Sequence, residues 1–219
     1  MKYSITLISF IFLLGCTKVG KNMTIKGRAV NPITGEGIPG ARVFLSRSKL
    51  DIGSATKIVK ETTTDENGSF EISKLSLSHC YLHCDPSVAG DYYQIGWEKK
   101  KDVPLFDAFT ISVKKGKTMH ADYYAVPYGN LILNINNVNC SGTGDVMNFH
   151  KKWVGFTDFE NFYSSSREGC YSYTSPYPFQ IPIGTYVYET KIVRSGITSF
   201  VYDTVTVAET GVSTINIDY

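Results

Sequence analysis

Apolar and polar side chains alternate with a period of two through most of this chain of 219 residues. The alternation is clearest in residues 41–45, 70–72 and 109–113. Such a period places every second side chain on one face of an extended strand, whereas a helix repeats its apolar residues about every three or four positions. No stretch of the sequence combines that helical period with capping residues. The sequence therefore predicts an all-β fold of half-buried strands.

Turn-forming pairs lie between these runs. Asn67-Gly68 is a pair that tolerates the positive φ angles of a tight turn, so we expect it to close a hairpin. Residues 115–117 and 195–196 each contain a glycine between alternating runs and predict two later hairpins in the same way.

Two segments of the chain match each other without a gap. Residues 106–123 read FDAFTISVKKGKTMHADY, and residues 202–219 read YDTVTVAETGVSTINIDY. Each is expected to be a hairpin around a glycine turn, and the match predicts two modules of one type. Pro127 and Gly129 interrupt the strand pattern between them. We therefore expect two consecutive small β-sandwich modules, residues 24–125 and 126–219.

The first module carries three short motifs in order: a strand with Gly27, the run Ile-Pro-Gly-Ala-Arg-Val at 38–43, and Thr-Asp-Glu-Asn-Gly-Ser-Phe at 64–70. Together they resemble the carboxypeptidase regulatory-like domain, a transthyretin-like β-sandwich. The match is specific over 24–72, and the second module lacks the Pro-Gly-Ala run. The resemblance implies a transthyretin-like or Ig-like sandwich that serves as a structural or binding accessory and has no catalytic residues.

The pair Pro39-Gly40 is expected to bend the chain so that the next alternating run enters the core. The inward-facing residues would be Ala41, Val43 and Leu45. The turn at 67–68 would direct Phe70 and Ile72 into the same core.

The N-terminus has the pattern of a secretory signal: Lys2, an apolar run over 5–14, and a small residue, Gly15, before Cys16. The run is too short to span a bilayer, which needs about 20 residues. Leu13-Leu14-Gly15-Cys16 resembles the lipobox of bacterial lipoproteins. This resemblance implies that residues 1–15 are removed, that Cys16 carries the lipid, and that 16–23 form a tether. An aspartate directly after the lipidated cysteine would signal retention in the inner membrane, and this chain has Thr17 there, so we favour the outer membrane. Whether the protein lies on the periplasmic face of that membrane or on the cell surface stays open.

Charge excludes one class of partner. Charged residues make up 19% of the chain and the net charge is +2, so the chain is expected to fold and has no electrostatic basis for binding nucleic acid. Its expected partners are the membrane, through the lipid, and an envelope protein or glycan.

Four cysteines remain after Cys16: Cys80, Cys84, Cys140 and Cys170. In an exported chain they are expected to form disulfides. We favour Cys80–Cys84 and Cys140–Cys170, because each pair then lies within one module. His79 and His83 each directly precede one cysteine of the first pair, and His and Cys are the ligand types of zinc and copper. A disulfide with two solvated histidines explains that cluster better, so no metal and no cofactor is predicted, with His79 and His83 as weak metal candidates.

Residues 149–179 are dense in aromatic side chains. Most are expected to fill the core, because aromatic residues favour strands. Exposed ones could stack on sugar rings or anchor a partner surface. The candidates for exposure and binding are Trp153, Tyr171, Tyr173 and Tyr177.

No catalytic motif such as G-x-S-x-G or H-E-x-x-H is present, and His120 and His150 have no evident partner in the sequence. We therefore expect a non-enzymatic binding or scaffolding module, which predicts a contiguous exposed aromatic or apolar patch. Two alternatives stay open: a glycan-binding module that uses residues 149–179, and an envelope hydrolase with a site built from loops. A hydrolase would bring carboxylates or histidines together in a pocket.

Overall fold

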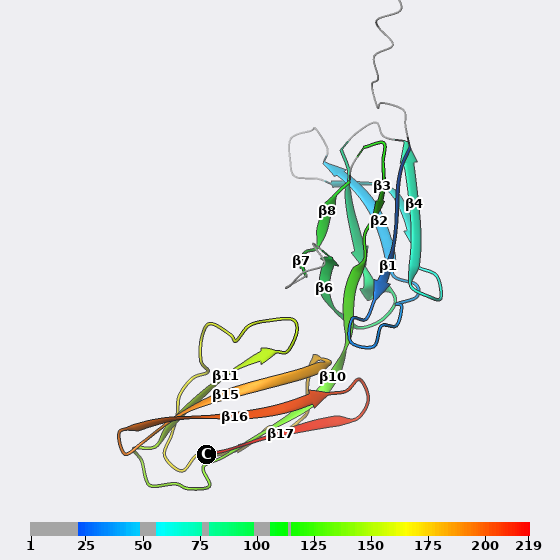
Figure 1. Cartoon of the computed structure of the whole chain (residues 1–219). Coiled ribbons are helices and arrows are strands. Elements are labelled where there is room, and N and C mark those ends of the chain that lie inside the picture. Colours follow the sequence, from blue (N-terminus) through cyan, green and yellow to red (C-terminus); the bar gives the residue numbers. More distant parts are fainter. Residues whose placement is uncertain (1–21, 49–55, 76–78, 99–105, 114) are drawn as a thin grey trace, which may run out of the picture.

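The computed structural model describes residues 22–48, 56–75, 79–98, 106–113 and 115–219. Cys16 and the leader lie outside these residues. Strands make up most of the described chain (Figure 1), and its helical structure is the short 3-10 turn η2 (Pro86–Val88). No helix in these residues is long and apolar enough to cross a membrane. The strands are β1 (Asn22–Val30), β2 (Arg42–Ser48), β3 (Thr56–Thr63), β4 (Ser69–Leu75), β5 (Tyr81–Asp85), β6 (Tyr92–Glu98), β7 (Phe106–Ala108), β8 (Thr110–Ser112), β9 (Thr118–His120), β10 (Tyr123–Asn136), β11 (Val146–Trp153), β12 (Arg167–Glu168), β13 (Ser172–Thr174), β14 (Phe179–Pro182), β15 (Gly184–Arg194), β16 (Ile197–Val207) and β17 (Val212–Asp218).

The first module is a sandwich of two sheets. In one sheet β1 pairs with β4 and β9, and at its end with the start of β10, which also pairs with β6. The facing sheet has the order β3-β2-β5-β8. The inward side chains of both sheets form one apolar core, whose largest fully buried members are Trp97, Tyr123, Met23, Ile25, Ile38, Leu45, Ile72 and Leu82.

The second module repeats this arrangement. The latter part of β10 pairs with β14, β13 and β17, and the facing sheet has the order β12-β11-β15-β16. A second, separate core lies between these sheets and includes Leu131, Met147, Tyr186, Tyr188 and Ile217. The predicted class, an all-β fold of two consecutive sandwiches, is therefore confirmed.

The long strand β10 joins the two modules (Figure 1), and it runs unbroken through Pro127 and Gly129, where the sequence suggested an interruption. Pro127 lies opposite Tyr92, at the end of the pairing with β6. Because proline has no backbone N–H to donate to a neighbouring strand, it disturbs a sheet least at such an end. Its carbonyl accepts a hydrogen bond from the Ile183 N–H at 3.1 Å. A proline at the end of one ladder and the start of another thus fits into a continuous strand.

The two matching segments are not hairpins. In residues 106–123, β8 pairs with β5 whereas β9 pairs with β1 in the facing sheet. In residues 202–219, β16 pairs with β15 whereas β17 pairs with β10. Both segments therefore cross from one sheet to the other, and both end on a strand parallel to the first strand of their module. The hairpin interpretation was wrong because alternation shows which side chains face inward and does not show which strand pairs.

The turns behave in two ways. Residues 195–196 form the predicted two-residue hairpin, because Arg194 pairs with Ile197 across it. Asn67-Gly68 instead turns the chain from β3 in one sheet to β4 in the other. The Asp65 side chain holds that turn, accepting hydrogen bonds from the backbone N–H groups of Asn67 at 2.9 Å and Ser69 at 2.8 Å.

The predicted core entry after Pro39-Gly40 is confirmed. Ala41, Val43 and Leu45 are fully buried, and Phe70 and Ile72 face the same core.

Candidate functional site

The cysteines and histidines of residues 79–84 lie on opposite faces of a sheet. Cys80 and Cys84 point into the first core, while His79 and His83 fall on the alternate positions. The predicted Cys80–Cys84 disulfide is wrong: both residues are buried thiols. Four residues of strand span about 13 Å, whereas a disulfide needs Cα atoms within about 7 Å.

Each histidine instead contacts a serine. His83 Nε2 lies 2.6 Å from the Ser46 hydroxyl, and its ring stacks on Phe44 at 4.6 Å. His79 Nε2 lies 3.2 Å from the Ser112 hydroxyl. Burial lowers the pKa of His83. Among the described residues, no group of three or more His, Cys, Asp or Glu side chains could hold a metal ion.

The two thiols should be chemically silent in the native protein. Burial, followed by the nearby Asp85, raises the pKa of Cys84 to about 12, so little thiolate exists at neutral pH. Maleimide should therefore leave Cys80 and Cys84 unlabelled in the native chain and label both in denaturant without reductant. Mass spectrometry of the peptide that carries them measures this. A peptide that stays unlabelled in denaturant would contradict the buried thiols.

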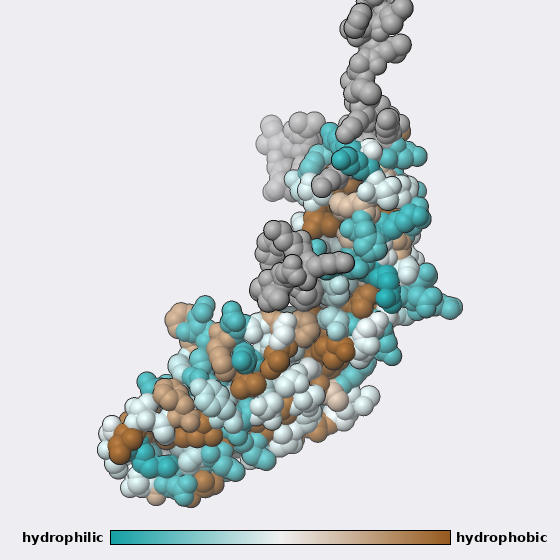
Figure 2. All heavy atoms as spheres, viewed as in Figure 1, coloured by the Kyte–Doolittle hydropathy of each residue, from teal (hydrophilic) through white to brown (hydrophobic). Residues whose placement is uncertain are grey.

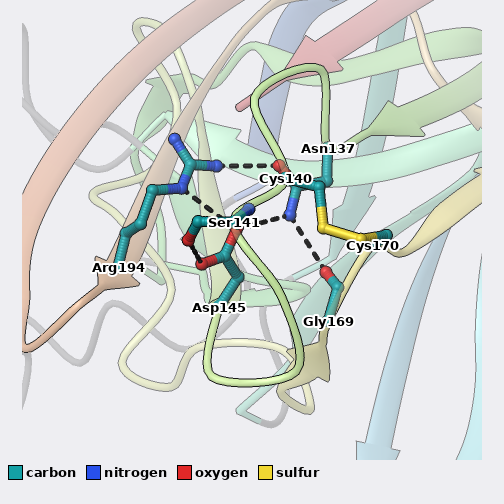
Figure 3. Close-up of polar contacts among 7 residues, drawn as sticks. All are labelled: Asn137, Cys140, Ser141, Asp145, Gly169, Cys170 and Arg194. Carbon is teal, nitrogen blue, oxygen red and sulfur yellow. Dashed lines mark hydrogen bonds and ion pairs between the residues drawn. A yellow bond between two sulfur atoms is a disulfide. The ribbon is translucent and has the colours of Figure 1, made fainter.

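The Cys140–Cys170 disulfide is confirmed, with the two Cα atoms 5.1 Å apart. It lies beside a buried carboxylate in the second module (Figure 3). Asp145 is 1% exposed, and it accepts hydrogen bonds from the Ser141 hydroxyl at 2.5 Å, the Asn137 amide at 2.9 Å and Arg194 Nε at 3.0 Å. These contacts fasten the loop after β10 to the end of β15, so the cluster is a structural clamp next to the disulfide.

Low pH should weaken these contacts, because they depend on the ionised carboxylate of Asp145. The hydrogen bonds from Ser141 and then Asn137 hold the pKa of Asp145 well below its ordinary value of 3.8. A carboxyl whose pKa is lowered by folding stabilises the protein above its unfolded pKa and stops doing so as pH falls through the folded one. The melting temperature should therefore drop below about pH 4. Asp145→Asn should be less stable at pH 7 and should show a smaller further loss at pH 3. An equal acid loss in both proteins would contradict this.

The structure does not bring the four aromatic binding candidates together. Trp153 is only 7% exposed, so the prediction of its exposure was wrong. Tyr171 is half-buried under Arg167, while Tyr173 and Tyr177 are exposed. Tyr173 lies on β13 beside Ile135, near the far end of β10, whereas Trp153 contacts Tyr93 near the module junction. Alternation along β11 points Trp153 inward, a signal that aromatic density alone conceals.

A cavity of about 440 Å³ opens at the junction and combines aromatic walls with polar side chains. Aromatic and apolar side chains form its walls: Tyr93 from β6, Trp153 from β11, Tyr186 from β15, and Phe159, Ile181 and Pro182. Tyr93 meets the Trp153 ring edge to face at 5.7 Å, and Tyr186 stacks parallel to Trp153 at 6.0 Å. Polar side chains line it as well, namely Lys151, Thr157, Asp158, Glu160 and Asn161.

The loop after β11 forms the polar side of the cavity and is held firmly. It runs back along the strand, with backbone hydrogen bonds from Thr157 N–H to the Trp153 carbonyl at 2.9 Å and from Glu160 N–H to the Lys151 carbonyl at 3.0 Å. The Thr157 hydroxyl also accepts from the Trp153 N–H at 2.9 Å. The cavity is therefore preformed, which lowers the entropy cost of binding. Sequence reasoning missed Tyr93, because its module and that of Trp153 meet only in the fold.

His150 lies next to this loop and is fully engaged. Its ring stacks between Phe159 and Tyr163, Nδ1 lies 2.9 Å from the Glu160 carbonyl, and Nε2 lies 3.0 Å from Glu189. Glu189 also accepts hydrogen bonds from Tyr163 and Tyr202, which lower its pKa. The sequence-based view of His150 as isolated was wrong, and both ring nitrogens are occupied by structural contacts.

Exposed apolar residues are spread over the second module. Figure 2 shows them in several separate groups on the face in view. The most exposed are Phe162, Tyr177, Ile197, Val138 and Tyr202. A contiguous apolar patch is not seen on that face.

No protein-family model matches this sequence, and no curated protein does. The chain is similar to solved structures at low identity. A DUF3823 family protein from Bacteroides uniformis is 15% identical over 82% of this chain and 95% of its own, with a TM-score of 0.32. The minor pilin GBS52 of Streptococcus agalactiae is 14% identical over 90% of this chain and 94% of its own, with a TM-score of 0.34. The shaft pilin SpaA of Lactobacillus rhamnosus is 9% identical over 91% and 97%, with a TM-score of 0.30. Likeness at this level assigns no function.

Proposed function

We propose that this chain is a lipid-anchored protein of the bacterial cell envelope, on the outer membrane, that acts as a non-enzymatic binding module. The lipobox-like residues 13–16 support the anchor. The observation that carries the proposal is the position of the cavity relative to that anchor. β1 begins at Asn22, and the end of β1 pairs with the start of β10, which leads into the second module. The anchored end and the cavity therefore lie at opposite ends of the first module.

This arrangement suits a spacer that carries a binding head. The few residues between Cys16 and Asn22 span at most about 20 Å, so a lipid on Cys16 would hold the first module close to the membrane. The second module would then project away from the bilayer. We assign residues 24–125 to the spacer, as a carboxypeptidase regulatory-like domain that also contributes Tyr93 to the cavity, and residues 126–219 to the head.

The contacts of the candidate catalytic groups support a non-enzymatic role. Both ring nitrogens of His150 face structural partners. Ser46 contacts His83, as the nucleophile of a hydrolase would contact its base, but Ser46 is 2% exposed. A buried hydroxyl cannot attack a substrate.

Cell fractionation tests the proposal. The wild-type chain, expressed with its leader in a diderm bacterium, should sediment with the outer membrane, and Cys16→Ser should be lost from that fraction. A Cys80→Ser variant serves as the control and should sediment like the wild type. Recovery of the wild-type chain in the cytosol, or of Cys16→Ser in the outer membrane, would refute the anchor.

A further inference from the structure

We infer that the cavity between Tyr93, Trp153 and Phe159 binds a neutral sugar unit of an oligosaccharide. This inference rests on the proposed function and names the ligand class of its binding head. The cavity is distinct from the exposed tyrosines of residues 171–177 that the sequence suggested.

The walls of the cavity fit one face of a sugar ring. A pyranose presents C–H groups on its faces and hydroxyl groups around its rim, so it binds best where aromatic surface adjoins hydrogen-bonding groups. Here Tyr93 is 41% exposed, so its ring offers surface, and Trp153 contacts it from within the module core. Phe159 is partly exposed and lines the same cavity, with its ring stacked on His150. The volume of about 440 Å³ lies in the range of small-ligand sites.

The charges around the cavity favour an uncharged ligand. Lys151 Nζ lies 2.6 Å from Glu160, so these two lining charges neutralise each other. Lys152 Nζ lies 4.9 Å from the centre of the Phe159 ring, beside the cavity, whereas Asp158 lines the cavity itself. The two lysines and two carboxylates in and beside the cavity together carry no net charge. A site for a phosphorylated or acidic ligand would show excess positive charge, and a site for a quaternary ammonium would show excess negative charge.

Polar side chains at the edge of the cavity could hydrogen-bond the hydroxyl groups of a bound sugar. Asp158 and Asn161 line the cavity from the loop after β11 and are exposed to solvent. A carboxylate accepts hydrogen bonds and an amide both donates and accepts, which matches the mixed capacity of hydroxyl groups. Because the loop is pinned to β11 by Thr157 and Glu160, these groups are positioned before the ligand arrives.

Tryptophan fluorescence of the full chain tests the inference. The chain has two tryptophans, and Trp97 is fully buried in the first core, so a ligand-dependent change reports on Trp153. The probes are neutral oligosaccharides of glucose, mannose, galactose and xylose, with choline and oligogalacturonate as charged comparisons. We expect saturable titration with at least one neutral probe and none with the charged ones.

Matched tyrosines locate the site. Tyr93→Ala should weaken binding at least about tenfold. Tyr173→Ala, a residue 39% exposed against 41% for Tyr93, should leave binding unchanged. Asp158→Ala alters an exposed side chain, so it should fold normally and weaken binding about threefold or more.

Three outcomes would overturn the inference: no titration with any neutral probe, titration with choline or oligogalacturonate alone, or binding that is unchanged in Tyr93→Ala. Its failure is separable from that of the proposed function. A chain that sediments with the outer membrane and binds no sugar refutes only the ligand class. A chain that binds sugar and stays in the cytosol refutes only the anchored role.

Discussion

Loss of the Cys140–Cys170 disulfide should lower the free energy of unfolding of the second module by about 3–4 kcal/mol. The bond links residues separated by 30 positions, and a cross-link of that length removes much of the conformational entropy of the unfolded chain. It also borders the loop in which Asn137 donates to the Gly169 carbonyl at 3.0 Å (Figure 3). For a module of this size the loss corresponds to a fall in melting temperature of roughly 15–25 °C.

Calorimetry of the wild type and of Cys140→Ser/Cys170→Ser measures this loss, and hydrogen exchange assigns it to a module. Exchange should rise in peptides of β11 and β15 and stay constant in β2 and β5, because the two cores are separate. Reductant should destabilise the wild type and leave the double variant unaffected. Equal melting temperatures, or a loss shared by both modules, would show that the disulfide does not stabilise the second module in this way.

Gly27→Ala should destabilise the first module by roughly 3 kcal/mol. A Cβ atom at this position would lie 1.7 Å from the Ala121 carbonyl oxygen and 2.7 Å from its carbon. These are backbone atoms, so no side-chain rotation can relieve the clash. The strand would have to move away from the segment after β9, which would break the 3.0 Å hydrogen bond from the Ala121 N–H to the Lys26 carbonyl.

Gly90→Ala is the matched control in the same module. Its added Cβ would meet only the flexible Tyr92 ring, at 3.1 Å. Denaturant unfolding of the two variants should separate them by roughly 2–3 kcal/mol. A Gly27→Ala variant as stable as Gly90→Ala would mean that β1 and the segment after β9 do not approach this closely.

The sequence predicts burial better than it predicts pairing. Alternation correctly places Ala41, Val43 and Leu45 in the core, and module membership correctly pairs Cys140 with Cys170. The first result depends on the local geometry of a strand, and the second depends on which residues share a module. The partner of a strand depends instead on contacts between distant segments, so the repeat at 202–219 was predicted as a hairpin although its strands lie in different sheets.

The candidate site was hard to predict from sequence for the same reason, because it depends on contacts between distant segments. Cys80 and Cys84 share a module, which suggested a bond between them, but they lie too far apart on an extended chain to form one. Tyr93 and Trp153 are 60 positions apart and touch only because β10 joins the modules. Aromatic density pointed to the stretch that contains Trp153 and Phe159, but the cavity is also lined by Tyr93 from outside it.

Mass spectrometry of the mature N-terminus tests most directly whether this chain is a lipid-anchored envelope protein. The purified protein should begin at Cys16, and its first peptide should carry the added mass of a diacylglyceryl group and lose it in Cys16→Ser. A purified chain that retains residues 1–15, or that begins at another residue without lipid, would contradict the anchored role.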